Sequence, residues 1–260
     1  MLRMLAALLA QCVVASVATA ACPPPALSDP TTLDVTHEQV LIVTHASSVF
    51  DPRFTTKYGV DSAVRYAKHQ GIPVVYLIDD SPLHTYMMED CSPSHWVQSA
   101  DGDIVFQIKA RHVLFAGGHM ELCLSRSVHD LLLQAARRND QDLKVTFLMD
   151  AIYSNGKTIQ ESDPFYEDVS KFFGVVTYGR PGGERWPKLN LLEATGVIKK
   201  PDYDYDYLTG LLPRWDRTFG PATRIEIQLN DLPLRVLRKG EGPLGRVVHF
   251  HFIDSADVMP

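Results

Sequence analysis

The residues with the clearest chemical potential lie in one short stretch, "AGGHMELC", which ends at Cys123. Gly117 and Gly118 turn the chain there, and an amphipathic segment starts at Cys123. At a helix N-terminus, unpaired backbone N–H groups and the helix dipole stabilise a thiolate and lower the pKa of the thiol. The N–H groups around Gly117, Gly118 and Cys123 could also stabilise an oxyanion. The sequence therefore predicts a reactive, partly accessible thiol at Cys123; the alternative is a buried structural cysteine.

One histidine could serve as the base for this thiol. His45 ends the apolar run "QVLIVTH", which is typical of a buried parallel strand. In an open α/β sheet, the strands end at the edge where the helices begin and where ligands bind. An imidazole at that edge could deprotonate Cys123 and form a Cys–His pair. Alternatively, His45 caps the strand and bonds to a backbone carbonyl.

Three more side chains are candidates for substrate contacts: His119, Glu121 and Asp51. His119 and Glu121 flank the glycine turn and could shuttle a proton or hold a substrate. The alternative is that both are solvated, with Glu121 favoured by the dipole of the helix that follows. Asp51 and Lys57 follow the first strand and could supply a carboxylate and an amine, or only surface charge.

The polar stretch "DDSPLHTYMMEDCSPSH" after the second strand is rich in residue types that bind metals, but it lacks a compact ligand spacing. Two histidines also alternate along a strand near the C-terminus, where no third ligand is evident. We therefore expect no metal and no cofactor. The residues considered are Asp79, Asp80, His84, Asp90, His95, His249 and His251.

The segments around the candidate residues predict a doubly wound α/β domain. Helical spacing of apolar residues in "GVDSAVRYAKHQ" follows the first strand, and "IPVVYLIDD" reads as a second buried strand. Ile104–Ile108 and Val113–Ala116 are either a short hairpin or two strands. A helix then runs from Cys123 to about Arg138, and "KVTFLMDA" is another strand. We expect a mostly parallel sheet with helices on both faces.

These segments resemble the isochorismatase-like cysteine hydrolases between about Gln39 and Gly156. In that family a strand leads through a glycine turn to a cysteine at a helix N-terminus, and a further strand ends in Asp-Ala, as Asp150-Ala151 does here. The resemblance implies hydrolysis of a small amide or related carbonyl substrate. Of the family's Asp, Lys and Cys, only the Cys carries over cleanly, as Cys123. The Asp position falls on His45, and no residue fills the Lys position; Lys109 and Gln107 are the nearest candidates.

The chain divides into a leader and two further parts. Residues 1–21 have a basic start, an apolar run and an Ala-Thr-Ala ending, which is typical of a secretory signal peptide; a lipoprotein signal ending at Cys22 is the competitor. Residues 36–180 form the predicted α/β domain. Residues 181–260 are loop-rich, with "TRIEIQLN", "LPLRVLRKG" and "RVVHFHFID" alternating as short antiparallel strands do. We expect export to the periplasm or the exterior.

Export places the cysteines in an oxidising compartment. Without the leader three remain, so one thiol stays unpaired. Cys22 precedes the core and Cys91 lies in a polar loop, which makes them the easier pair to join. The sequence therefore predicts a Cys22–Cys91 disulfide and a free Cys123.

The charge balance argues against a nucleic-acid partner, since 25 Lys and Arg against 31 Asp and Glu give a net charge of -6. We also expect no membrane span; a homo-oligomer remains open. Two hypotheses follow. The first is an exported hydrolase that uses Cys123 with His45 as base. The second is a catalytically inactive exported domain of the same fold that binds a small molecule or a protein partner.

Overall fold

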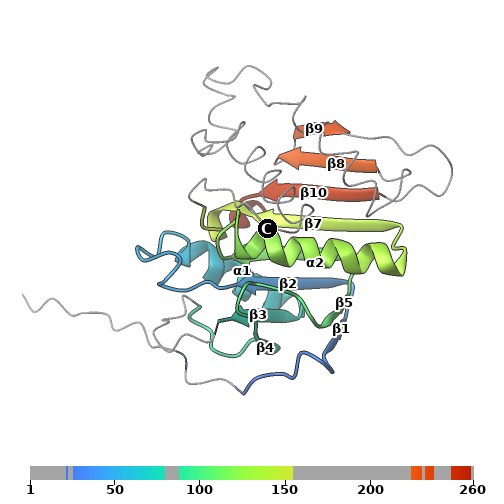
Figure 1. The fold of residues 1–260 in the computed structure, drawn as a ribbon. Helices are drawn as coiled ribbons and strands as arrows, with labels where there is room; N and C mark the ends of the chain where they lie inside the picture. Colours follow the sequence, from blue (N-terminus) through green and yellow to red (C-terminus); the bar gives the residue numbers. More distant parts are fainter. Residues whose placement is uncertain are drawn as a thin grey trace, which may run out of the picture.

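The computed structural model describes residues 22, 26–79, 88–154, 224–229, 232–236 and 247–258. Within these residues one sheet contains eight strands in the order β4-β3-β2-β6-β7-β10-β8-β9 (Figure 1). All neighbours pair in parallel except β8 and β9. The strands are β2 Gln39–Thr44, β3 Val74–Ile78, β4 His95–Gln98, β6 His112–Gly117, β7 Asp142–Leu148, β8 Arg224–Leu229, β9 Leu232–Val236 and β10 Val247–Ile253.

Two helices cover opposite faces of this sheet, as expected for a doubly wound fold. α1, Lys57–His69, packs against the face that carries Leu41 and Val43 of β2. α2, Cys123–Arg138, packs against the face that carries Val40 and Ile42. The continuous apolar run of β2 follows directly, because a strand that is buried on both faces needs apolar residues at every position.

The helix α2 begins and ends where the sequence predicts. Its apolar face, from Leu124 through Val128, Leu131 and Leu132 to Ala135, is buried in the core. At its C-terminus, Asn139 adopts the left-handed conformation with φ 58°, and its N–H bonds back to carbonyls of the last turn. Asparagine tolerates this conformation better than most residues, so it ends the helix as a glycine would.

The segment before β6 differs from a hairpin. β5, Gln107–Lys109, pairs in parallel with β1, Asp34–Thr36, in a separate two-stranded sheet. β6 instead joins the main sheet between β2 and β7. The alternative of two separate strands is therefore correct, and the hairpin is wrong.

The C-terminal strands extend the same sheet. β8 and β9 pair antiparallel, as expected for residues beyond 181. β10 is different, because it lies parallel to both β7 and β8 inside the main sheet. Phe250 and Phe252 of β10 stack towards Phe147 of β7, and all three are buried. The domain division at residue 181 stays a prediction.

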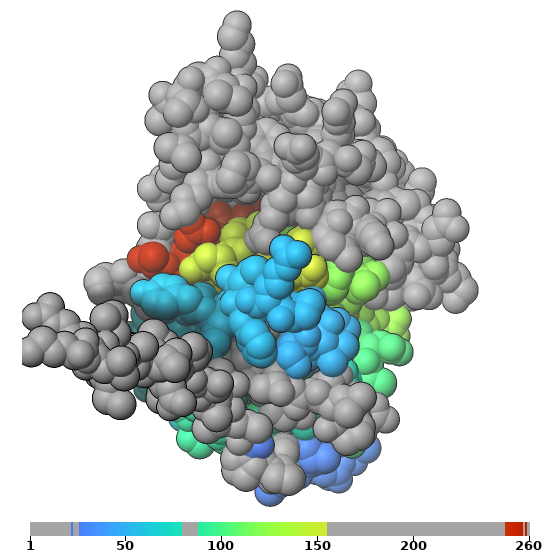
Figure 2. Space-filling view, turned by 90° about the vertical axis from the view of Figure 1, so that its left-hand side faces the viewer, coloured from blue at the N-terminus to red at the C-terminus, as the bar shows by residue number. Residues whose placement is uncertain are grey.

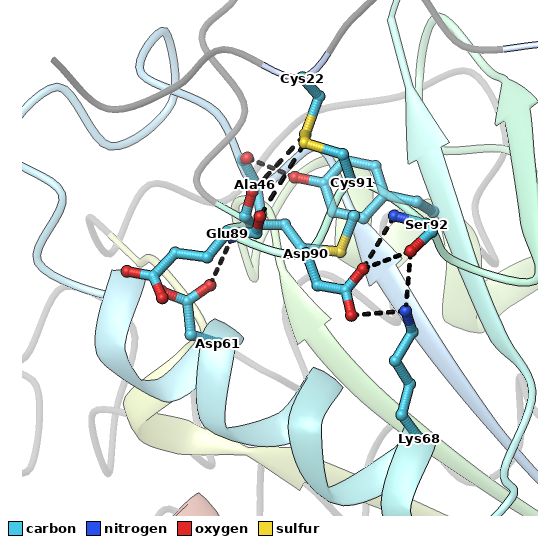
Figure 3. Close-up of a disulfide and its surroundings, with 10 residues drawn as sticks. Cys22, Ala46, Asp61, Lys68, Glu89, Asp90, Cys91 and Ser92 are labelled. Carbon is cyan, nitrogen blue, oxygen red and sulfur yellow. Dashed lines mark hydrogen bonds and ion pairs between the residues drawn. A yellow bond between two sulfur atoms is a disulfide. The ribbon is translucent and has the colours of Figure 1, made fainter.

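The predicted disulfide between Cys22 and Cys91 is present, with the two Cα atoms 5.2 Å apart (Figure 3). Beside it, Lys68 of α1 forms an ion pair of 2.5 Å with Asp90. The disulfide and the ion pair together fasten the loop between β3 and β4 to the N-terminal arm and to α1. Cys123 is the free cysteine among the described residues.

Two expectations concern membranes and export. Among the described residues, no helix is both long and apolar enough to cross a bilayer. The predicted signal peptide, residues 1–21, lies outside the described residues. Export therefore stays a prediction.

Candidate functional site

The predicted site residues gather at the edge where the parallel strands end. Thr44, the last residue of β2, pairs with Gly117, the last residue of β6. Figure 2 faces this edge, and the light-blue loop that follows β2 lies at its centre. His45 leaves β2 here, and α2 begins here at Cys123. The fold thus brings together the histidine, the glycine turn and the cysteine.

Cys123 occupies the first helical position of α2. The backbone N–H of His119 donates a hydrogen bond of 3.3 Å to its Sγ. The residue is 7% exposed, so the partly accessible thiol predicted from the sequence is wrong for this structure. In the described residues, the hydrogen-bond contacts of Sγ are with the His119 backbone rather than with His45.

Burial also reverses the predicted pKa shift. Removal of the thiol from water raises the pKa of Cys123 to about 11, and the negative charge of Asp79 acts in the same direction. Backbone N–H groups of His119, Leu124 and Cys123 itself oppose the shift but do not overcome it. The helix N-terminus stabilises the thiolate as expected, yet desolvation is the larger effect.

The glycine turn permits the close approach of the chain to the thiol. Gly117 and Gly118 both have positive φ, at 76° and 58°. A Cβ on Gly118 would lie 2.8 Å from the carbonyl oxygen of Thr44 and 3.1 Å from Sγ of Cys123. Only glycine fits such a position, because an L side chain would be both strained and in collision.

His45 lies at the predicted edge with a defined tautomer. Its ring is buried, stacks on Phe50 with centroids 5.4 Å apart, and places Nε2 2.6 Å from the carbonyl oxygen of Ser99. Because a carbonyl only accepts, Nε2 carries the hydrogen of this bond. The backbone bond expected from the capping alternative is therefore present.

His119 and Glu121 are buried rather than solvated. Glu121 is 0% exposed, and one of its oxygens accepts a hydrogen bond from the Ser154 hydroxyl. Its other oxygen lies 3.7 Å from Nδ1 of His119, whose ring meets Tyr153 edge to face. The segment that contacts this pair, at Tyr153 and Ser154, is distant in sequence, which explains why a solvated first turn is the wrong expectation.

Asp51 is likewise buried, at 1% exposure, and not a surface charge. Its Oδ2 accepts hydrogen bonds from Thr55 and Thr56 at the start of α1. Lys57, the other candidate in this loop, is paired with Asp61 at 2.6 Å and with Glu89 at 3.0 Å. The ammonium group of Lys57 therefore bonds to carboxylates on and beside α1 and does not serve as a site residue.

The candidates for the family's lysine position lie at the opposite edge. Lys109 and Gln107 belong to β5, and Lys109 bonds to Asp34 at 2.5 Å. Lys109 lines a hollow of about 860 Å³ with Arg111 and Arg138, at the end of the sheet where β6 begins. Cys123 therefore has neither of these residues as a neighbour.

The candidate metal ligands that the structure describes have other contacts. In the described part of the chain, no group of three His, Cys, Asp or Glu side chains could hold a metal ion. Asp90 bonds to Lys68 and Ser92, and His95 faces Ser28. His249 lies 3.3 Å from Asp142. Asp80 and His84 lie outside the described residues.

Two neighbours of the thiol were not among the site residues predicted from the sequence. Asp79 directly follows β3 and is close enough to influence the pKa of Cys123. Gly102 packs on the first turn of α2, where an added Cβ would lie 2.4 Å from the Cys123 carbonyl oxygen. The position of Asp79 at a strand end was the available signal, since strand ends meet at one edge.

The described geometry repeats the family features that the sequence suggests: β6 runs through a glycine turn to Cys123 at the start of α2, and β7 leads into Asp150 and Ala151. No family model and no curated protein matches the chain. Solved structures similar to the chain include N-carbamoylsarcosine amidase from Thermoplasma acidophilum, with 15% identity, TM-score 0.35, and coverage of 53% of this chain and 94% of that one. Pyrazinamidase of Pyrococcus horikoshii in complex with zinc has 14% identity, TM-score 0.36, and coverage of 54% and 96%. An isochorismatase family protein has 9% identity, TM-score 0.37, and coverage of 56% and 97%.

Proposed function

We propose that the protein is an exported cysteine-dependent hydrolase that acts on a small amide or a related carbonyl substrate. One observation carries the proposal: a free thiol begins α2 at the carboxyl edge of the sheet, next to a glycine turn and to the strand that leads into His45. An amide as the substrate agrees with the similar solved structures, which include an N-carbamoylsarcosine amidase and a pyrazinamidase.

The chemistry requires the thiol to lose its proton when substrate binds. At neutral pH the resting thiol is protonated, since its pKa is about 11. His45 takes the proton on Nδ1, directly or through one water, and the thiolate attacks the carbonyl carbon. The C–N bond breaks as the imidazolium returns the proton to the leaving nitrogen. Water then hydrolyses the thioester and releases the carboxylic acid.

Backbone groups supply the remaining stabilisation. N–H groups that already surround Sγ, from His119 and the first residues of α2, lie where negative charge develops. The positive end of the helix dipole acts on the same charge. Such preorganised donors act without a metal ion or a cofactor.

The test is a screen of primary amides and carbamoyl compounds with the wild-type protein and two variants. Cys123→Ser should abolish turnover, while His45→Gln should lower the rate about 100-fold or more, as expected for the loss of a general base. Turnover that survives Cys123→Ser would exclude the thioester route. Circular dichroism of each variant shows that the fold is kept.

The second candidate function is a non-catalytic binding domain of the same fold. It is favoured by the buried thiol with its raised pKa and by the absence of the family's Asp and Lys from their expected positions. In that case the wild-type protein hydrolyses none of the compounds, yet a compound that binds at the edge raises its unfolding temperature.

A further inference from the structure

The loop between β2 and α1 holds two buried polar atoms that lack hydrogen-bond partners in the described part of the chain. They are Oδ1 of Asp51 and Oγ of Ser47. Both residues are 1% exposed. A buried polar group without a hydrogen bond destabilises the folded chain, and a charged group does so more strongly. Two such atoms in one loop point to a ligand that supplies the missing bonds.

The hydrogen bonds to Asp51 favour the charged form of its carboxyl. Its Oδ2 accepts three hydrogen bonds, from the Thr55 hydroxyl at 2.9 Å and from the Thr56 N–H and hydroxyl at 2.8 and 3.0 Å. Burial alone would raise the pKa of the carboxyl, but the backbone N–H groups and the hydroxyls of Thr55 and Thr56 hold it below its ordinary value. All three hydrogen bonds from these residues reach Oδ2, and Oδ1 has no hydrogen-bond partner in the described part of the chain.

The two atoms belong to residues of one turn in the loop that follows β2. The N–H of Asp51 donates a hydrogen bond of 3.0 Å to the carbonyl of Ser47, which joins the two residues across that turn. A Cβ on Gly117 would lie 3.0 Å from the Cβ of the preceding Ala46, whose carbonyl accepts the Tyr76 hydroxyl at 2.5 Å. The loop therefore starts beside the glycine turn, and a Cβ on Gly118 of that turn would lie 3.1 Å from Sγ of Cys123.

We propose that Asp51 and Ser47 bind a cationic N–H group, an ammonium or an amidinium, of the compound whose carbonyl Cys123 attacks. The carboxylate oxygen accepts one N–H and balances the charge, while the hydroxyl oxygen accepts a second N–H. This rests on the proposed function of Cys123, and it restricts the substrate to amides that carry a positive charge near the scissile bond.

The test compares a cationic and a neutral reagent of similar size at Cys123. The thiolate attacks 2-aminoethyl methanethiosulfonate or the neutral methyl analogue, forming a mixed disulfide and releasing methanesulfinate, and the labelled peptide is identified by mass. In Asp51→Asn the ratio of the cationic to the neutral rate constant should fall about 10-fold, as expected for one charge removed at short range. Ser47→Ala should lower the ratio about 3-fold, the loss of one modest hydrogen bond. Asp34→Asn is the matched control, because it removes a carboxylate from the opposite edge and should leave the ratio unchanged.

An unchanged ratio in both variants overturns the proposal, and the two atoms then hold only water. If Asp51→Asn does not fold, Ser47→Ala decides alone, since Ser47 Oγ makes no bond that folding would lose. If the thiol reacts too slowly, ligand-observed NMR with benzamidine and neutral benzamide gives the same comparison. Neither readout needs turnover. If the ratio falls in the variants but the protein hydrolyses no amide, the cation site is kept and the hydrolase function is excluded. If the protein hydrolyses amides but the ratio is unchanged in the variants, the hydrolase function is kept and the cation site is excluded.

Discussion

The backbone N–H of His119 donates a hydrogen bond to Sγ of Cys123, and the two residues are separated by a single turn of chain. This hydrogen bond stabilises the thiolate, whereas burial raises the pKa of the thiol. The carboxylate of Asp79 adds to the increase. The resting site is therefore a protonated thiol within a shell of N–H groups, which an accepting base must activate.

The reactivity of Cys123 should follow its raised pKa. Below a pKa of about 11, the rate of alkylation should rise about 10-fold per pH unit, with no plateau near neutral pH. Iodoacetamide labelling between pH 7 and 10, followed by peptide mass spectrometry, measures this. A plateau below pH 8 would show that the thiolate is stabilised far more than burial allows.

Cys123 should also make stability depend on alkaline pH. The folded pKa of about 11 lies above the ordinary 9.0, so the folded state holds the proton more tightly than the unfolded chain. The contribution is fully present below pH 9 and is lost as pH rises through 9 to 11. Urea unfolding at pH 8 and pH 10 should show a smaller loss for Cys123→Ala than for the wild type. Equal losses would contradict the assignment.

His112 should make the protein sensitive to acid. Burial, with the charges of Lys144 and His251, lowers its pKa to about 4, and its Nε2 lies 2.8 Å from the Thr146 hydroxyl. Below pH 6.5 the histidine binds a proton in the unfolded chain but not in the folded state. The contribution of His112 to the free energy of unfolding is therefore fully present above pH 6.5 and is lost as the pH falls towards 4. At pH 5 the expected loss is about 2 kcal/mol relative to pH 7. His112→Gln should remove most of that difference in urea unfolding.

The carboxylate of Asp150 should hold the C-terminal helix in place. It accepts hydrogen bonds from the N–H and the hydroxyl of Ser255, at 2.6 and 2.5 Å, and Ser255 is 0% exposed. Asp150→Ala leaves both donors buried and should cost about 2–4 kcal/mol. Faster amide hydrogen exchange at α6, Ser255–Val258, would locate the effect. Asp150→Asn keeps one acceptor oxygen, so its free energy of unfolding should lie between those of the wild type and Asp150→Ala.

Removal of the disulfide should destabilise the fold. The bond closes a loop whose ends are 69 residues apart, for which chain entropy gives about 4 kcal/mol. Cys22→Ser with Cys91→Ser should lower the free energy of unfolding by up to that amount. Reduction of the disulfide in the wild type should lower the free energy of unfolding by a similar amount. The same reducing agent should leave the free energy of unfolding of the double variant unchanged.

The helix α2, the strand β2 and the disulfide could be predicted from the sequence, because each depends on a local pattern or on simple counting. The direction of β10 could not. Alternation with period two shows which face a strand buries but not which neighbour it pairs with, so Val247–Ile253 is as compatible with an antiparallel sheet as with a place beside β7. The candidate site shows the same limit. The burial of Asp51 and Glu121 depends on packing and on distant residues such as Ser154, which no local pattern indicates.

The inner position of β10 has a consequence for the order of folding. The pairs that join β10 to β7, like the bond between Asp150 and Ser255, connect residues about 105 positions apart, so they close late and at a high entropic cost. Until β10 arrives, β7 is an open strand edge that carries Val145 and Phe147, a template on which another chain can pair. A chaperone that shields this edge, or a high rate of β10 docking, would decide how much of the protein reaches its folded state without aggregating.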